Sequence, residues 1–201
     1  MRRLLHRLRR DARGVTLIEF AFVAPVMLLL LMGLCDLAYQ CYVQAMLTGA
    51  MQKAGRDSTL EGAATQSAQI DATVASWVRS VAANAQFAPV RKNYAQFSHI
   101  KAEEFTDANG NGTYEPATEC FWDVNGNRTR DLDPGLTGQG GANDVVLYTM
   151  TVTYPRLFPL AGMLGWPSTQ SASASTILKN QPWGSQNSFA VVQVCPPPPS
   201  P

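Results

Sequence analysis

Residues 14–34 read Gly14-Val15-Thr-Leu-Ile-Glu19-Phe-Ala-Phe-Val-Ala-Pro25-Val-Met-Leu-Leu-Leu-Leu-Met-Gly33-Leu34. The 20 residues from Val15 to Leu34 hold one charged side chain, Glu19, and charge returns at Asp36. About 20 apolar residues are enough to span a bilayer core as a helix. The stretch therefore predicts one transmembrane helix. Its carboxylate points to a function, because ionisable groups inside a membrane are costly and rare.

The segment before this helix is strongly basic. Residues 1–14 contain six arginines and a single acid, Asp11. Basic flanks tend to stay in the cytoplasm, so the chain beyond Asp36 is expected outside it. A secretory signal peptide is the alternative interpretation. The length of the apolar run, the carboxylate of Glu19 and the lack of an Ala-x-Ala-like cleavage site argue against it.

Charge and cysteine usage restrict the function classes further. Without residues 1–14 the chain keeps 10 basic and 14 acidic side chains, which is unsuited to binding nucleic acid. Cys35 and Cys41 would lie about 9 Å apart along a helix axis, too far for a disulfide. Cys120 and Cys195 lie in the extracytoplasmic part, where oxidising conditions allow them to pair. Two free buried thiols are the alternative.

The pattern predicts an α+β fold with a long N-terminal transmembrane helix, a second amphipathic helix and a small antiparallel sheet of about three strands. The first helix continues to about residue 60, because that region is rich in good helix formers. Residues 69–86 carry apolar side chains at helical spacing. Strands are predicted at 97–105, 145–154 and 170–178, most clearly at 145–154, where two sets of residues alternate strictly.

These elements divide the chain into four parts. Residues 1–14 are a basic cytoplasmic leader, and residues 15–62 form the transmembrane and extended N-terminal helix. Residues 63–184 form an extracytoplasmic α+β domain with a polar insert at about 105–143. Residues 185–201 form a tail that ends in prolines. Within the domain, residues 155–167 are unusually apolar. They would cap the core, touch the membrane surface or bury themselves against a neighbouring subunit.

The polar insert contains two similar segments. Each begins Asp-x-Asn-Gly-Asn, and the second starts 16 residues after the first. Oxygen ligands at alternate positions suit Ca²⁺, so calcium is the cofactor that these segments would take. The loops resemble EF-hand loops incompletely: position twelve of the first is Thr118, with Glu119 one residue late, and Arg128 replaces the glycine preferred in the second. Ordinary Asn-Gly turns are the alternative. The candidate ligands are Asp107, Asn109, Asn111 and Glu115, and then Asp123, Asn125, Asn127, Asp131 and Asp133.

The N-terminal pattern resembles a known family. A basic stretch followed by Gly-x-x-x-x-Glu-Phe-Ala-x-x-x-Pro is similar to the N-terminus of TadE-like proteins, minor pilins or pseudopilins of the Tad/Flp tight-adherence pilus in the type IV pilin superfamily. The similarity covers about residues 10–56. A weaker similarity covers about residues 141–184, from Asp144-Val-Val-Leu-Tyr-Thr-Met-Thr-Val-Thr-Tyr-Pro155 to the strand that follows the apolar loop. The length suits the TadE branch and not the longer TadG proteins.

The resemblance implies how the chain is processed and with what it assembles. A prepilin peptidase would cut between Gly14 and Val15, and Glu19 would pair with the new amine of a neighbouring subunit. The partners implied are that peptidase, other Tad pilus subunits, the inner-membrane assembly platform and the lipid bilayer. The implied location is the bacterial inner membrane, in a single pass, with the N-terminus cytoplasmic and the C-terminal domain periplasmic or incorporated in the pilus.

No pattern in the sequence indicates an enzyme. His6 lies in the leader, and His99, the other histidine, belongs to no recognisable catalytic motif and is expected on a strand surface. A component of pilus assembly is the leading function. The alternative is a single-pass membrane protein with a calcium-binding adhesive ectodomain outside any fibre.

Overall fold

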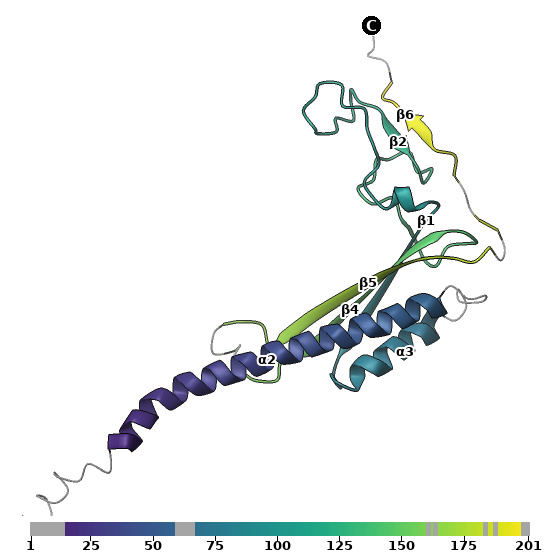
Figure 1. Cartoon of the computed structure of the whole chain (residues 1–201). Helices are drawn as coiled ribbons and strands as arrows, with labels where there is room; N and C mark the ends of the chain where they lie inside the picture. The colour runs from purple at the N-terminus through teal and green to yellow at the C-terminus, as the bar shows by residue number, and fades with distance from the viewer. Residues whose placement is uncertain are drawn as a thin grey trace, which may run out of the picture.

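The computed structural model describes residues 15–58, 67–159, 162, 165–182, 185–186 and 189–197. The predicted leader, the end of the first helix beyond residue 58 and the last prolines lie outside these residues. The α+β architecture is confirmed (Figure 1). The elements in chain order are α2 (Val15–Asp57), α3 (Ser67–Arg79), β1 (Gln86–Tyr94), the 3-10 helix η2 (Phe97–His99), β2 (Phe121–Asp123), β3 (Leu136–Thr137), β4 (Val145–Pro155), β5 (Thr169–Lys179) and β6 (Val192–Val194).

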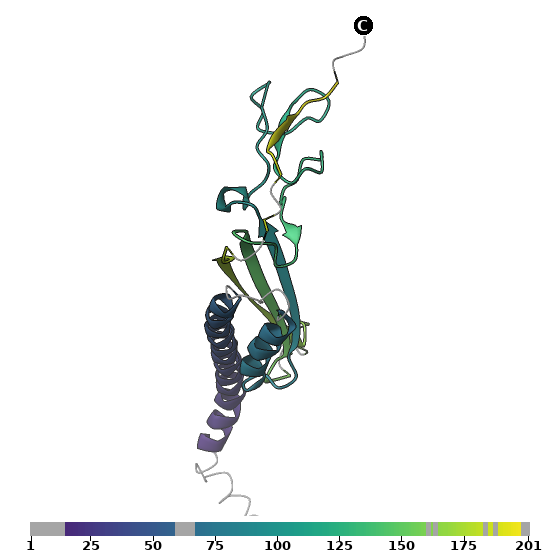
Figure 2. The same ribbon diagram turned by 90° about the vertical axis from the view of Figure 1, so that its right-hand side faces the viewer.

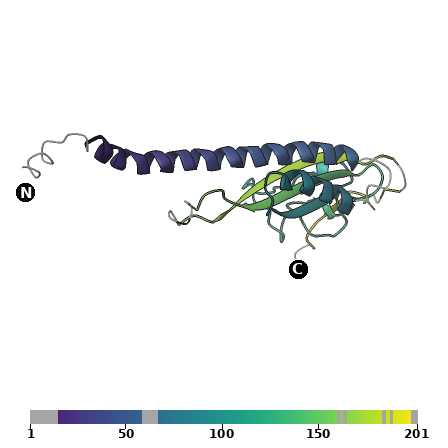
Figure 3. The ribbon, with the colours of Figure 1, turned by 90° about the horizontal axis from the view of Figure 1, so that it is seen from below.

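Helix α2 has two halves with different surroundings. At 1.5 Å per residue its 43 residues extend about 65 Å, and its N-terminal half projects beyond the rest of the molecule (Figure 3). That half is apolar all round, and its large side chains from Leu17 to Leu37 are exposed. A helix that is hydrophobic on every side needs an apolar surrounding, which a bilayer provides. The C-terminal half is instead buried along one face.

The main sheet is antiparallel, with strand order β3-β1-β4-β5. The predicted alternation in β4 is confirmed: Val146, Tyr148, Met150, Val152 and Tyr154 are all at most 1 % exposed. Strand β5 pairs with β4 along its whole length, from Pro155 opposite Thr169 to Val145 opposite Lys179. The strands predicted at 145–154 and 170–178 therefore form one long hairpin at the centre of the fold.

Both helices cover the same face of this sheet (Figure 2). Helix α2 contributes a stripe of buried residues at helical spacing, and α3 contributes a second stripe. Fully burying one Val, Leu or Met side chain is worth about 1.5 to 3 kcal/mol, so these stripes contribute several kcal/mol of apolar burial together with the buried face of β4. The stripes consist of Val43, Leu47, Ala50, Met51 and Ala54 in α2 and of Ile70, Val74 and Val78 in α3.

Helix α2 also lies close to the backbone of the edge strand β5. The side chain of Gln44 donates a 3.0 Å hydrogen bond to the carbonyl of Ser173. Gly55 permits a close approach farther along, since a Cβ atom there would stand 2.9 Å from the Thr176 hydroxyl. An exposed edge strand offers unpaired backbone groups to other chains, and α2 covers part of this one.

A polar clamp fixes the point at which α2 meets the sheet. Arg156 follows β4 and donates a 2.6 Å bond from Nη1 to Oδ2 of Asp36, with side chains only 22 % and 15 % exposed. Gln170 of β5 donates a second 2.6 Å bond to the same oxygen. The N–H of Leu157 donates to Oδ1. Asp36 is thus the acceptor that joins the helix to both strands of the hairpin.

A second ion pair joins α3 to the sheet. Arg91 of β1 donates two hydrogen bonds to Asp71 of α3, and its guanidinium carbon lies 3.9 Å from the centre of the Tyr148 ring. The Tyr148 hydroxyl donates to the same carboxylate. Burial first, and then this bond to Asp71, raise the pKa of Tyr148 above its ordinary value. The network fixes α3 over the middle of β4.

Two sequence predictions about the region after α3 were wrong. The second helix ends at Arg79 and not at residue 86. Residues 80–85 form turns that lead into β1, and residues 86–94 pair with β4 over nine positions. Pro89, expected beyond a helix, lies inside this strand. It is tolerated because β3 covers only Lys92 and Asn93, which leaves the backbone beside Pro89 free on that side. Residues 97–105 form η2 and an irregular segment, with one bridge from Phe105 to Phe121.

The clamp yields a test of the fold. We expect Asp36→Asn to lower the free energy of unfolding by about 1 to 3 kcal/mol, because Arg156 loses the charge of its partner in a half-buried site. The measurement is thermal unfolding of the full-length protein in detergent. The exposed Lys53–Asp57 pair, 2.8 Å apart on the same helix, supplies the control, and Lys53→Ala should change stability by less than about 1 kcal/mol. If both variants lower stability by the same amount, Asp36 does not fix the helix to the sheet.

Candidate functional site

Two regions carry the candidate functional residues, and they lie at opposite ends of the molecule (Figure 1). At the membrane end, Val15 is the first residue of α2 and Glu19 lies exposed one turn later. Gly14 lies outside the described residues. Pro25 lies inside the helix, where it removes one backbone N–H. The residues from Thr16 on include a window long and apolar enough to cross a membrane, none of it buried in the protein.

The distal end is a small irregular module built on the two-stranded sheet of β2 and β6. Cys120 precedes β2, Cys195 follows β6, and their sulfur atoms form a disulfide. The bridge joins segments 75 residues apart, so it closes a long loop and holds the C-terminal segment on the module. Cys35 and Cys41 are exposed thiols on α2.

The first Asn-Gly segment forms a closed loop around its own side chains. The carboxylate of Asp107 accepts backbone N–H bonds from Gly110, Asn111 and Gly112 at 2.7 to 3.1 Å. The amide groups of Asn109 and Asn111 each donate to the carboxylate of Glu115, at 3.1 and 3.0 Å. Four of the predicted ligands therefore meet in this loop.

The second segment repeats this arrangement. The carboxylate of Asp123 accepts N–H bonds from Asn125, Gly126 and Arg128. The amides of Asn125 and Asn127 donate to Asp131 at 2.8 and 2.6 Å. Arg128 has a φ of 62°, close to the 73° of Gly112 at the same loop position. A left-handed conformation costs a non-glycine residue about 1 kcal/mol, so the loop imposes it on Arg128.

The structure does not bring Asp133 into the second loop. Its carboxylate pairs with Lys92 of β1 and accepts a 2.7 Å bond from the Tyr94 hydroxyl. Burial acts to raise the pKa of Asp133. The hydrogen bonds from Lys92, from Tyr94 and from the N–H of Gly135 outweigh burial and hold this pKa below its ordinary value. Asp133 therefore ties the distal module to the main sheet.

Two glutamates that the sequence analysis did not assign complete the loops. Glu119, 1 % exposed, accepts N–H bonds from Ala108 and Glu115 of the first loop, at 2.9 and 3.0 Å. Glu103, 3 % exposed, makes the equivalent bonds to the N–H groups of Val124 and Asp131, both at 2.9 Å. Glu119 supports the first loop but lies four residues before the start of the second, and Glu103 supports the second loop but lies four residues before the start of the first. The same spacing of 16 residues, from 103 to 119, was the signal in the sequence.

Because each glutamate supports the loop that it does not precede, the two Asn-Gly loops are related by an approximate two-fold symmetry. Phe105 and Phe121, equivalent in the repeat, form an antiparallel bridge, flanked by backbone bonds from Thr106 to Cys120 and from Trp122 to Glu104. Antiparallel pairing of equivalent residues relates the two segments by a two-fold rotation. The ring of Tyr114 packs edge-on against both phenylalanines, at 5.6 and 5.9 Å between ring centres.

The chemistry of the loops restricts the ions that they would hold. Among the described residues, no three His, Cys, Asp or Glu side chains gather closely enough to hold a metal ion. A cation would therefore depend on asparagine oxygens, which suit Ca²⁺ and not zinc or other transition metals. Backbone N–H bonds, that of Gly112 above all, hold the pKa of Asp107 below its ordinary value, so this carboxylate is ionised at neutral pH.

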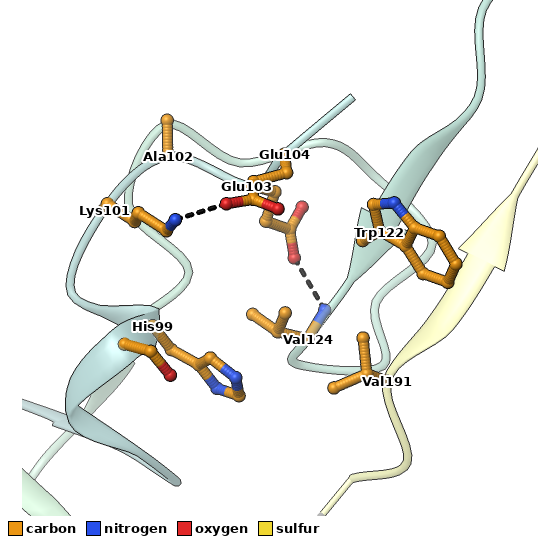
Figure 4. Close-up of a pocket in the computed structure, with 9 residues that line it drawn as sticks. His99, Lys101, Ala102, Glu103, Glu104, Trp122, Val124 and Val191 are labelled. Atoms are coloured by element: carbon orange, nitrogen blue, oxygen red, sulfur yellow. Dashed lines mark hydrogen bonds and ion pairs between the residues drawn. The ribbon is translucent and has the colours of Figure 1, made fainter. Parts of the chain in front are cut away.

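A shallow cavity lies beside the loops (Figure 4). His99 borders it from η2, and not from a strand as the sequence predicted. Burial, and then the charge of Lys101, lower the pKa of His99, so the imidazole is neutral at pH 7. Lys101 pairs with Glu104 in the same wall, and Glu103 is occupied by loop N–H groups. The charged groups of this wall are therefore already paired or hydrogen-bonded.

Comparison with known proteins identifies the membrane end. Residues 14–56 match the model of the TadE-like protein family. The resemblance seen in the N-terminal sequence is confirmed over this TadE-like segment, which coincides with nearly the whole of α2. It suggests a protein associated with the Tad pilus. In the part of the chain that the structure describes, one helix is long and apolar enough to cross a membrane. Comparisons with curated proteins and with solved structures gave no match. The similarity expected over residues 141–184 stays a prediction.

The exchanged glutamates give a matched pair of tests. Glu119→Ala should speed hydrogen exchange at Ala108 and Glu115, because each amide loses a buried acceptor. Glu103→Ala should do the same at Val124 and Asp131. Exchange is measured by mass spectrometry on the full-length protein in detergent, and each variant serves as the control for the other. If each variant speeds hydrogen exchange equally in both loops, the two glutamates do not each support one loop.

Proposed function

We propose that this chain is a membrane-anchored minor pilin or pseudopilin needed for assembly of a Tad-type (Flp) pilus. One observation carries the proposal: a TadE-like segment begins at Gly14, its apolar helix begins one residue later, and Glu19 lies exposed one turn into that helix. The basic residues before it favour a cytoplasmic N-terminus in the inner membrane, with the α+β domain on the other side.

In this proposal a prepilin peptidase cuts between Gly14 and Val15. A peptidase must bring its catalytic groups close to the backbone, and glycine presents no side chain to obstruct them. The cut places a new amine on Val15, at the start of α2. Partners after the cut are other Tad pilus subunits and the assembly platform of the inner membrane.

Glu19 supplies the reason for assembly. A carboxylate without a partner in the low dielectric of the bilayer raises the free energy of the isolated subunit. Glu19 is exposed on α2 and so is open to a neighbouring subunit. Pairing with the Val15 amine of that neighbour would offset the cost in the assembled state alone, which favours packing of subunits side by side.

The processing step is tested at Gly14. We expect the mature protein to begin at Val15 and to lack the first 14 residues, whereas Gly14→Val should retain them because a branched side chain blocks the peptidase. Intact-mass measurement of membrane-extracted protein, from cells with and without an active prepilin peptidase, distinguishes the two forms. An uncut wild-type chain in cells with the peptidase would overturn the proposal.

The role of Glu19 is tested separately from cleavage. Glu19→Gln should still be cut and inserted, yet support roughly tenfold less assembled pilus, equivalent to about 1.4 kcal/mol, because the neutral amide cannot pair with an ammonium group as strongly. Sheared pilus yield and membrane content are measured together. Thr16→Ala, on the same turn of α2, is the control and should leave the yield unchanged. Normal yield from Glu19→Gln would remove the pair from the mechanism.

A specific observation favours a second function. We propose that the paired loops bind Ca²⁺, because both gather one aspartate, two asparagines and one further carboxylate in the same hydrogen-bonded arrangement. The ligands would be Asp107, Asn109, Asn111 and Glu115, and Asp123, Asn125, Asn127 and Asp131. A cation would have to displace the side-chain amide groups that now donate hydrogen bonds to Glu115 and Asp131. Weak binding, of the millimolar kind found in extracellular modules, is therefore expected.

Calcium binding predicts a rise in melting temperature that depends on the loop carboxylates. Full-length protein in detergent should unfold a few degrees higher in millimolar Ca²⁺ than in chelator, and Glu115→Gln with Asp131→Asn should remove most of that gain. Asp133→Asn is the control: it should lower the melting temperature equally with and without calcium, because Asp133 binds Lys92 outside the loops. A wild-type melting temperature indifferent to calcium would leave the segments as Asn-Gly turns.

A further inference from the structure

We propose that the two described ends of the segment between β4 and β5 lie in the interfacial layer of the bilayer, in the leaflet away from the basic N-terminal residues, with Leu157 and Trp166 in contact with lipid. The inference depends on the membrane anchor alone and is independent of cleavage or pilus assembly. It selects one of the three roles that the sequence left open for residues 155–167.

The clamp at Asp36 sets the depth of this loop. Asp36 lies two residues past the apolar run, which is about 3 Å along a helix axis. The interfacial layer outside the hydrocarbon core is about 5 to 8 Å thick on each side. Arg156 binds Asp36 directly through Nη1. It also donates from Nε to the carbonyl of Pro167 and from its backbone N–H to the carbonyl of Ser168, which joins the two ends of the loop. Both ends of the loop are therefore fixed at the membrane surface.

The direction of the strands points the loop toward the membrane and not away from it. Strand β5 runs alongside α2 in the same direction, since Gln170 binds Asp36 and Ser173, farther along β5, binds Gln44. The loop comes before β5 and so lies at the end of the hairpin nearest the apolar half of α2. Figures 1 and 3 show its described part beside α2 at that end.

The side chains of the loop suit an interface between lipid and water. Leu157 is 52 % exposed and Trp166 is 60 % exposed, so neither caps the protein core. Tryptophan and tyrosine gather at membrane interfaces, and the exposed Tyr42 lies on α2 just beyond the apolar run. The charge of Arg156 is neutralised by Asp36, which lowers the cost of placing it near lipid.

Two single-tryptophan variants of the full-length protein test the contact. One retains Trp166 and carries W77F, W122F and W183F; the other retains Trp122, in the distal strand β2, and carries W77F, W166F and W183F. Trp122 is 41 % exposed and serves as the matched control. Both are reconstituted in phosphatidylcholine vesicles, and flotation establishes that α2 is inserted. Emission is then measured with acrylamide and with lipids brominated near the headgroup end of their chains.

We expect brominated lipid to reduce Trp166 emission about twofold and to leave Trp122 emission unchanged, while acrylamide quenches Trp122 more strongly. Two results overturn the proposal. In the first, Trp166 responds to both quenchers as Trp122 does. In the second, Trp166 is shielded from acrylamide but insensitive to brominated lipid, which means that a second copy of the protein covers it. If the protein does not float with the vesicles, α2 is not a membrane anchor and the proposal is overturned. If the leader is uncut, the proposed function fails but the proposed lipid contact is unaffected.

Discussion

The packing of the second half of α2 on the β4–β5 hairpin is the contact on which the rest of the structure depends. The stripe from Val43 to Ala54 supplies apolar burial of several kcal/mol, and the Asp36–Arg156 clamp fixes where that burial begins. Apolar burial contributes more free energy than the clamp, but it does not by itself fix how far along α2 the sheet packs. The polar clamp supplies the register, because a half-buried charge without its partner is costly at any other position.

The distal module is stabilised by different means. Its strands β2 and β6 are three residues each, and its loops are rich in Asp, Asn and Gly, so little apolar surface is available there. Buried Glu103 and Glu119 satisfy four backbone N–H groups between them, and the disulfide fixes the C-terminal segment. Order in this module therefore comes mainly from satisfied polar groups and a covalent link.

One helix connects these two ends. Its first half is uniform around its circumference, as a bilayer requires, and its second half is one-sided, as packing on a sheet requires. The change falls between Asp36 and Val43. The α+β domain therefore lies next to the apolar half of α2, and the two Asn-Gly loops lie at the far end of the molecule (Figure 1).

The sequence by itself determined the elements whose pattern is local. The apolar run of α2, the alternation of β4 and the small residues of β5 each specify their structure through a period that needs no partner. The repeated Asp-x-Asn-Gly-Asn segments were likewise visible, with most of their converging side chains. Tertiary structure alone decided the rest. Strand β1 contains Pro89 and an ion-pairing Arg91, and it exists because β4 pairs with it. Glu103 and Glu119 serve loops other than the ones they precede, and Asp133 binds Lys92 of β1. Such contacts depend on which segments meet in space, and no local period encodes that.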